Sequence, residues 1–398
     1  MEPAATDALV DYAADSQPVD PLEVGLDAAV LTKLVARVRR DVDEGALPSA
    51  QIAVASHGRI VVDRTFGAEP HTRYVVFSCT KAIVAAAVWR LLDSGSIDVD
   101  SLVADYIADF ASEGLDSVTV EHLLTHTAGF PNAKMDMADW VDSHRRLKTF
   151  AQWGLESTPG ERFEYHGTSA SWVLAHLIEV TSGQDYRVFV RKEVLNPMGL
   201  SGLTLGVTQE SPGGEDPAGL VPVGAAADPG EAAAIGLDIS AIGADQKALL
   251  IQNDPAIRAI GQPAGGAVGR AAELALFYQS LLSDPLGLWS PEVLRAGTRD
   301  VRCTLPDPMT GVPANRTLGL VVAGDDGNAM MRGFGRSISA LGFGHMGAGG
   351  QIAWADPRSG ISMSYLTNGL DRDPLRMGAR SDAISTLAGR STADSGLE

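Results

Sequence analysis

The chain has 398 residues, of which 45% are hydrophobic and 20% are charged, a composition typical of a globular protein with a substantial core. Its formal net charge of -19 argues against nucleic acid or an anionic membrane surface as a partner, because both would repel it. Two cysteines, Cys79 and Cys303, do not make a disulfide framework, and no apolar run approaches the roughly 18 residues of a membrane span.

The N-terminal segment is acidic and contains alanine and proline, which predicts a flexible tail over residues 1–22. This segment has neither the basic region nor the apolar region of a secretory signal. We therefore expect a cytoplasmic protein.

Hydrophobic periodicity predicts the elements in chain order. Apolar residues at helical spacing predict a helix over 27–44, and two β-branched runs at 50–55 and 59–64 predict a hairpin. Further helices are expected at 82–92, 120–126, 169–182, 186–195 and 269–282. Strands are expected again at 317–322, 351–355 and 361–366, before a closing helix at 381–387.

Strands near both ends of the chain predict one discontinuous sheet domain, built from residues 23–98 and 312–392. Residues 99–311 are predicted to form a mainly helical domain inserted between these two parts. Within it, residues 206–233 are rich in Gly, Pro and Ala, and we expect them to form a long irregular segment that acts as a rim or lid.

The first candidate for chemistry is the tetrad Ser78-Cys79-Thr80-Lys81, which opens a helix-forming run. A spacing of three residues is about one helical turn, so Ser78 and Lys81 can share a face. A serine hydroxyl is a good nucleophile only when a base takes its proton, and a lysine can be that base if burial or nearby positive charge disfavours its ammonium form. The N–H groups of a first helical turn can stabilise an oxyanion. On spacing alone, a helix cap and a surface charge are the favoured interpretation of the pair.

Two further segments carry candidate groups. Tyr165 ends the run PGERFEY ahead of a helix, and a phenol can act as a general base where a positive charge such as that of Lys81 is close. The segment 344–350 (GHMGAGG) precedes a strand, so its backbone can approach a ligand closely and His345 can bind or polarise a substrate. Taken singly, each segment also fits a structural role, as a packing tyrosine and as a turn.

Other kinds of site receive less support. His122 and His126 have the spacing of a metal-binding pair, but the His-Glu-x-x-His pattern and a third ligand are absent, so structural roles are favoured. We expect no metal and no cofactor. The chain has no Gly-x-Ser-x-Gly elbow and no Walker-type loop, and the Gly-x-Gly-x-x-Gly match at 342–347 leads into a strand rather than a helix.

Five motifs together, in this order, resemble those of the serine hydrolases related to class C β-lactamases, a group that includes family VIII carboxylesterases and D-alanyl-D-alanine peptidases. The motifs lie at 77–81 (FSCTK), 123–129 (LLTHTAG), 159–165 (PGERFEY), 196–200 (NPMGL) and 344–350 (GHMGAGG). The resemblance spans roughly residues 24–390, and the ordered set is far more specific than any one motif.

The resemblance implies a mixed α/β (α+β) fold: an antiparallel sheet flanked by helices, an inserted helical domain, and an active site between them. Ser78 would be the acylated nucleophile. Lys81 and Tyr165 would activate it and relay its proton to the leaving group.

The glycine-rich segment would supply the rest of the site. The backbone N–H groups of Ser78 and Ala348 would form the oxyanion hole, with Gly347 beside them in the substrate-binding segment. His345 stands where the lactamases and peptidases of the group place the lysine of Lys-Thr-Gly.

Two departures from that pattern favour the esterase branch. The residues after Tyr165 are His166-Gly167 rather than the x-Asn of the lactamases and peptidases, so the side-chain amide that grips a substrate amide is missing. His345 likewise does not provide the fixed cation that would hold a β-lactam or peptide carboxylate.

The resulting hypothesis is a serine carboxylesterase that hydrolyses a small-molecule ester through an acyl-enzyme. Three alternatives use the same serine: an amidase or peptidase, a β-lactam hydrolase, and an acyltransferase. A binding protein with a degenerate site is disfavoured, because Ser78, Lys81 and Tyr165 are all present. No nucleic acid or membrane partner is expected, and the sequence does not indicate an oligomeric state.

Overall fold

The computed structural model describes residues 17–111, 114–207, 217–228, 230 and 246–392. Most of the tail predicted over 1–22 and nearly half of the lid predicted over 206–233 lie outside these residues. None of the helices in the described ranges is both long enough and apolar enough to cross a membrane.

The main sheet has six strands in the order β2-β1-β10-β9-β8-β7, and every neighbouring pair is antiparallel. The strands come from the two ends of the chain: β1 (Ala50–Ser56), β2 (Arg59–Phe66), β7 (Val321–Val322), β8 (Phe343–Gly347), β9 (Gln351–Asp356) and β10 (Ile361–Thr367). The N-terminal hairpin joins the C-terminal strands through β1 and β10, in a register that pairs Ala53 with Ser364. Both faces of these two central strands are buried.

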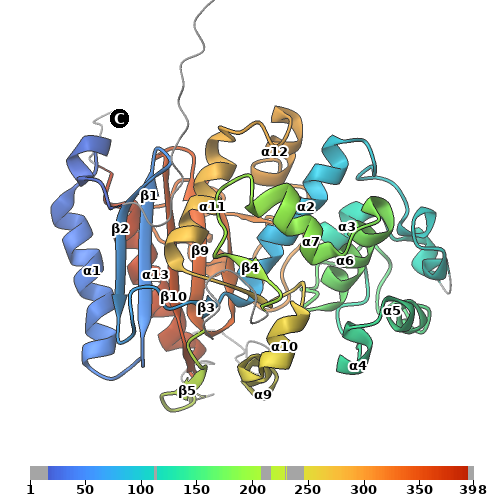
Figure 1. Ribbon diagram of the computed structural model, residues 1–398, viewed down its shortest axis with the longest axis horizontal. Helices are drawn as coiled ribbons and strands as arrows, with labels where there is room; N and C mark the ends of the chain where they lie inside the picture. The colour runs from blue at the N-terminus through green and yellow to red at the C-terminus, as the bar shows by residue number, and fades with distance from the viewer. Residues whose placement is uncertain (1–16, 112–113, 208–216, 229, 231–245, 393–398) are drawn as a thin grey trace, which may run out of the picture.

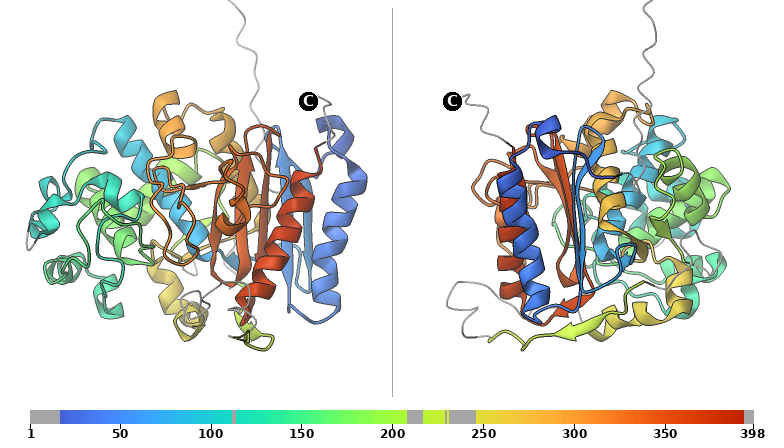
Figure 2. Two further views of the ribbon diagram at one scale, coloured as in Figure 1. Left: turned by 180° about the vertical axis from the view of Figure 1, so that it is seen from behind. Right: turned by 60° about the vertical axis from the view of Figure 1, so that its left-hand side comes forward.

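Helices cover both faces of the sheet. On one face, α1 (Ala28–Asp43) and α13 (Pro374–Gly389) lie side by side (Figure 2). On the other face, α11 (Ala271–Ser283) packs across β1, β9 and β10 (Figure 1). Apolar side chains such as Leu34 and Trp354 fill the first layer, because the inward stripe of α1 meets one face of the sheet.

A helical region lies beside the sheet, with α2 (Thr80–Asp93) running between the two (Figure 1). Nearly every residue of α2 is buried, which explains its all-round apolar sequence. The other helices are α3 (Val120–Leu124), α4 (Met137–Trp140), α5 (Ser143–Phe150), α6 (Ser169–Ser182), α7 (Tyr186–Val190), α9 (Gln246–Leu250), α10 (Pro255–Ile260) and α12 (Pro291–Thr298). A π-helical turn, Arg191–Leu195, extends α7.

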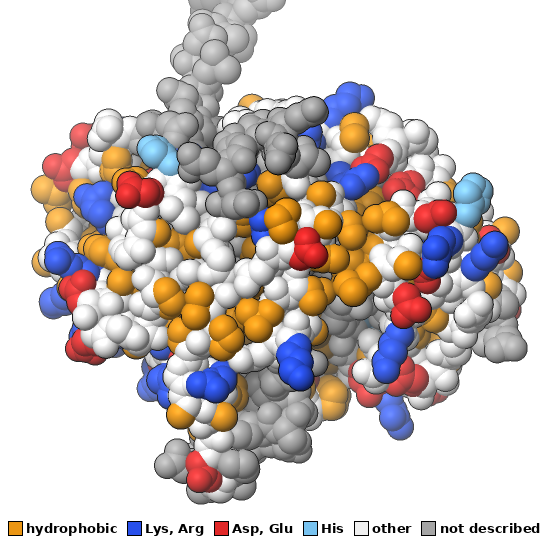
Figure 3. All heavy atoms as spheres, turned by 60° about the horizontal axis from the view of Figure 1, so that its bottom comes forward, with side chains coloured by type: hydrophobic (Ala, Val, Ile, Leu, Met, Phe, Trp, Pro, Cys, Tyr) orange, Lys and Arg blue, Asp and Glu red, His pale blue; other side chains and the backbone are white. Residues whose placement is uncertain are grey.

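Two small sheets connect these parts. The three strands β3 (Tyr74–Val75), β6 (Ala267–Gly269) and β4 (Thr204–Leu205) pair in that order. The strand β5 (Val221–Val223) pairs in parallel with β11 (Gly369–Asp371), so the described part of the expected lid contains a strand. Figure 3 shows the lower face of Figure 1, where hydrophobic side chains gather in the middle and charged groups of both signs lie mainly towards the edges.

The antiparallel sheet flanked by helices, predicted from the resemblance, is confirmed, and two local expectations need correction. The strand expected at 317–322 is reduced to β7, because Gly319 has a φ of 103° and the turn closes with a hydrogen bond from Thr317 N to Leu320 O. The segment 344–350, expected only to precede the strand at 351–355, itself contributes residues 344–347 to the strand β8. The domain boundaries remain a prediction.

Candidate active site

Ser78 lies in a short 3-10 helix, Phe77–Cys79, that leads directly into α2. The first backbone N–H bonded within this turn is that of Cys79, which donates to Val76 O at 3.2 Å. The N–H of Ser78 precedes that bond and has no helical acceptor. Phe77 has a φ of 46°, a left-handed conformation that bulky residues rarely adopt. The nucleophile candidate therefore follows a strained residue.

Lys81 is buried in the first turn of α2, and its Nζ donates to three oxygens. These are Ser78 Oγ at 3.4 Å, Gly167 O at 2.8 Å and Ala264 O at 3.1 Å. The three acceptors account for the three protons of an ammonium group. The lysine thus joins the Ser78 turn to two segments that are distant in the sequence.

Tyr165 is half-buried beside Lys81. Lys81 Nζ lies over its ring, 5.0 Å from the ring centroid, and the imidazole of His126 lies 4.7 Å from it, centroid to centroid. Within the described ranges, the phenol hydroxyl makes no hydrogen bond. It is therefore open to a new partner such as a substrate or water.

The histidines next to Tyr165 are neutral. His166 donates from Nδ1 to Glu164 O at 2.6 Å and accepts at Nε2 from Phe130 N at 3.2 Å, which leaves no room for a second ring proton. Burial lowers the pKa of His166 to about 4. Burial, and then the positive charge of Arg316, hold the pKa of His126 well below its usual range.

The spacing of His122 and His126 serves local structure. Nδ1 of His122 accepts from Thr119 N and completes a capping box on α3, while Nδ1 of His126 accepts from His166 N. Among the residues that the structure describes, no three His, Cys, Asp or Glu side chains form a group that could hold a metal ion.

The strand β8 packs against the turn that carries Ser78, so it brings the predicted substrate-binding residues to the same place. Cys79 Sγ donates to His345 O at 3.2 Å. A Cβ added to Gly347 would lie 2.5 Å from Val76 O, so only glycine permits this close approach. Ala348 follows directly and packs against the hydrophobic cluster that contains Phe77.

His345 is buried and does not act as a cation here. Its Nδ1 donates to Met346 O at 2.6 Å, which leaves the lone pair of Nε2 facing Arg316 Nη1 at 3.4 Å. Burial, followed by the charges of Arg316 and Lys81, keeps the pKa of His345 well below its usual range. The histidine at the lysine position is therefore a neutral group.

Arg316 is the site residue that sequence reasoning missed. Its guanidinium carbon lies 5.4 Å from the ring centroid of Phe163 and 5.5 Å from that of Tyr165. Burial lowers the pKa of Arg316, and the attraction of Tyr165 opposes this. No motif marks this residue. The only signal is a charged residue directly before a segment expected to be a buried strand.

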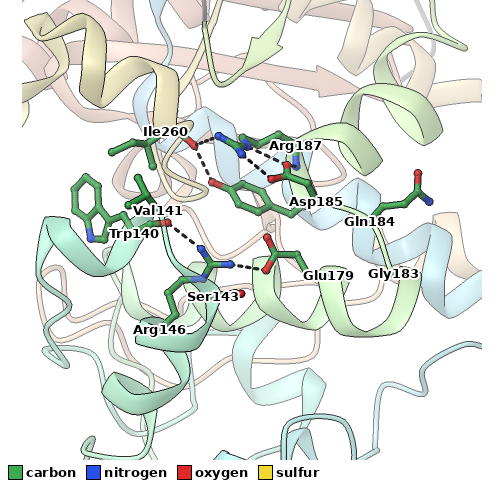
Figure 4. A pocket seen from close by; sticks show the side chains of 11 residues that line it. Trp140, Val141, Ser143, Arg146, Glu179, Gly183, Gln184, Asp185, Arg187 and Ile260 are labelled. Atoms are coloured by element: carbon green, nitrogen blue, oxygen red, sulfur yellow. Dashed lines mark hydrogen bonds and ion pairs between the residues drawn. The ribbon is translucent and has the colours of Figure 1, made fainter.

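A separate cavity of about 380 Å³ lies among the helices (Figure 4). Two ion pairs line it, Arg146 with Glu179 and Arg187 with Asp185. Neither Ser78 nor Tyr165 lines this cavity. Because both arginines have carboxylate partners, the cavity offers no free cation to a ligand.

Comparison with known proteins identifies the family to which this chain belongs. The family model described as Beta-lactamase matches residues 34–386. "Esterase/beta-lactamase LipL" of Mycobacterium tuberculosis is 27% identical over 314 residues, which cover 74% of this chain and 69% of that protein.

Solved structures share the fold. A family VIII carboxylesterase superimposes with a TM-score of 0.73 at 24% identity, over 92% of this chain and 99% of that one. A penicillin-binding protein homolog from Caulobacter crescentus superimposes with a TM-score of 0.70 at 24% identity, with the same coverage of both chains.

Proposed function

Since the chain belongs to the Beta-lactamase family and has the fold of its hydrolases, we propose that it is a serine carboxylesterase acting through a covalent acyl-enzyme on Ser78. The observation that carries the proposal is the contact of 3.4 Å between Lys81 Nζ and Ser78 Oγ, with the ring of Tyr165 next to the same Nζ. A serine needs a proton acceptor, and Lys81 Nζ links Ser78 Oγ to the phenol ring that we assign as that acceptor.

In the proposed acylation step, Tyr165, as a phenolate, takes the proton of Ser78 while Oγ attacks the ester carbonyl carbon. The negative charge that develops on the carbonyl oxygen is stabilised by the N–H groups of Ser78 and Ala348. The bond to the leaving oxygen then breaks, and the phenol of Tyr165 returns its proton to that oxygen. An alcohol leaves, and the acyl group stays on Ser78.

Deacylation follows the same steps, with water as the nucleophile. Tyr165 takes a proton from water, the hydroxide adds to the acyl carbon, and the bond to Ser78 Oγ breaks. The proton passes to Oγ, which restores the serine and releases a carboxylic acid. Lys81 holds Ser78 Oγ in place throughout, through its hydrogen bonds to Ser78, Gly167 and Ala264.

Two features support an ester rather than an amide as the substrate. Gly167 has no side chain to grip a substrate amide, and the space around its Cβ position is open. Two similar proteins are an esterase/beta-lactamase and a family VIII carboxylesterase by name. Hydrolysis of a β-lactam is the second candidate, because Arg316 offers a cation near the site that a lactam carboxylate could approach.

The proposal is tested by intact-protein mass spectrometry after brief exposure to a p-nitrophenyl ester, a cephalosporin and a D-amino-acid amide. We expect the ester to add its acyl mass to the wild type and nothing to Ser78→Ala. The matched control is Ser364→Ala, which removes a buried hydroxyl that has no hydrogen-bond partner among the described residues. Turnover of the amide or the lactam alone would contradict the esterase assignment, and labelling of Ser78→Ala would point to another nucleophile.

The cytoplasmic location and the small-molecule substrate belong to the same proposal. Cell fractionation with an antibody against the chain tests the location, and recovery in the cytosolic fraction is the expected result.

A further inference from the structure

Arg316 is a buried cation that forms no ion pair with an acidic side chain among the described residues. Among the described residues, its Nε has no hydrogen-bond partner, and no carboxylate lies within ion-pair distance of its guanidinium. Burying an unpaired charge costs several kcal/mol, so a guanidinium left in this state requires an explanation. Three other buried arginines are paired with carboxylates: Arg380 with Asp41 and Asp371, Arg146 with Glu179, and Arg332 with Asp326.

The groups that face Tyr165 come from several elements. They are Lys81 of α2, His126 after α3, His166 next in the chain, Arg316 before β7 and His345 of β8. The three imidazoles are neutral at physiological pH. Arg316 also interacts with Asp307 and Cys303, but neither forms an ion pair with it. Lys81 and Arg316 are therefore the charged side chains among these groups, 5.0 and 5.5 Å from the ring centroid.

The two cations differ in what holds them. Lys81 donates to three oxygens, whereas the contacts of Arg316 are two aromatic rings and the imine nitrogen of His345. A guanidinium stays protonated over the whole physiological range, and its position between two rings fixes its orientation. Arg316 thus provides a permanent charge at a fixed place beside Tyr165.

We propose that Arg316 is the fixed cation of this active site and that it stabilises Tyr165 as the phenolate that accepts the proton of Ser78. Arg316, which precedes β7, supplies the positive charge that His345 does not carry. Arg316 touches Tyr165 and not the reacting atoms, so it is a positioning residue. The proposal rests on the proposed function of Tyr165 as the base.

The first test compares Arg316→Met, which removes the charge, with Arg316→Lys, which keeps it. With a p-nitrophenyl ester, we expect Arg316→Met to lower kcat about 100-fold with little change in KM, as for loss of a general base. The acidic limb of the pH profile of kcat moves to higher pH in Arg316→Met. In Arg316→Lys, which keeps the charge, the limb is expected to lie close to its wild-type position. The matched control Arg380→Met removes a buried arginine next to α1 and is expected to lower stability without moving the limb.

The second test combines Arg316→Met with Tyr165→Phe. If Arg316 acts through the phenol, the double variant is no slower than Tyr165→Phe alone, because coupled residues are not additive. If Arg316→Met lowers kcat in the Tyr165→Phe background by the same factor as in the wild type, the proposal is overturned. A rise in KM alone, confined to esters that carry a carboxylate, would also overturn it and would make Arg316 a substrate anchor.

A third measurement needs no arginine variant and remains available if Arg316→Met fails to fold. A free tyrosine side chain is protonated at about pH 8. The ultraviolet difference spectrum between the wild type and Tyr165→Phe at that pH is expected to show tyrosinate absorbance, and its absence would contradict the proposal. Acyl labelling of Ser78 that persists in such a case would leave the acyl-enzyme on Ser78 intact, and would reject the phenolate form of Tyr165 together with the role of Arg316.

Discussion

Lys81 Nζ donates a hydrogen bond of 2.8 Å to the carbonyl oxygen of Gly167. This bond ties the helix of the proposed nucleophile to the segment that carries Tyr165, so the two halves of the site cannot separate without breaking it. The acceptor is a backbone oxygen, so the side chain at position 167 can change without loss of the bond.

The first prediction concerns that position. Gly167→Asn introduces the side-chain amide that the lactamases and peptidases of the resembling group possess, and nothing lies within 4 Å of its Cβ position. We expect the variant to fold and the ratio of amide or lactam turnover to ester turnover to rise about fivefold, the effect of one hydrogen bond of about 1 kcal/mol. Steady-state kinetics on matched ester and amide substrates measure this ratio. Gly167→Ala is the control, and a similar rise in this variant would show that the amide is not responsible.

The second prediction concerns the contact of β8 with the Ser78 turn. In Gly347→Ala, the new methyl group would lie 2.5 Å from Val76 O and 2.9 Å from Gln351 Cβ, so the strand must shift. Overpacking of this kind costs about 1–3 kcal/mol, and the shift displaces the proposed oxyanion donor of Ala348. We expect a lower Tm and a loss of kcat.

Gly378→Ala is the matched control for that experiment. It lies in α13 with nothing within 4 Å of its Cβ position, so it is expected to gain about 0.5–1 kcal/mol and to keep full activity. If Gly347→Ala proved as active and as stable as the wild type, the close approach of β8 would not be required.

The third prediction concerns Phe77, whose φ of 46° is strained for a bulky residue. Both Phe77→Ala and Phe77→Gly lose the burial of the ring, but only glycine relieves the backbone. We expect Phe77→Gly to be more stable than Phe77→Ala by about 1 kcal/mol, the reverse of their usual order in helices and strands. Urea unfolding measures the difference, and an alanine variant more stable than the glycine variant would contradict the strain.

The fourth prediction is a dependence of stability on pH. Burial lowers the pKa of His166 from 6.5 to about 4, so the unfolded chain binds its proton at higher pH than the folded one. The contribution of His166 is fully present above about pH 6.5 and is lost as the pH falls towards 4, by about 3 kcal/mol in total. Free energies of unfolding in urea at several pH values measure this loss.

His166→Gln is expected to reduce the loss over the same interval, because glutamine does not titrate. The exposed residue His144 supplies the control, and His144→Gln should leave the pH profile of the wild type unchanged. A pH profile that is the same in His166→Gln and in the wild type would show that other groups cause the acid sensitivity.

Much of the local structure can be predicted from the sequence, because residue spacing and capping residues indicate where individual helices and strands begin and end. The hairpin of β1 and β2, the cap of α3 at Thr119 and the end of α6 at Gly183 lie where the pattern predicts them. The strand expected at 317–322 was wrong for a tertiary reason. A Cβ on Gly319 would lie 2.4 Å from Ala85 Cβ of α2, and the chain turns there to pass close to that helix.

By itself, the sequence determined the tetrad, the order of the motifs and, through them, the family, because these depend on residue identity and on spacing within single turns. Only the tertiary structure decided that Lys81 faces the ring of Tyr165, that His345 is held neutral, and that Arg316 brings a permanent charge between two rings. The physical reason is that burial and the meeting of distant segments set the charge of each group, and neither is encoded in local periodicity.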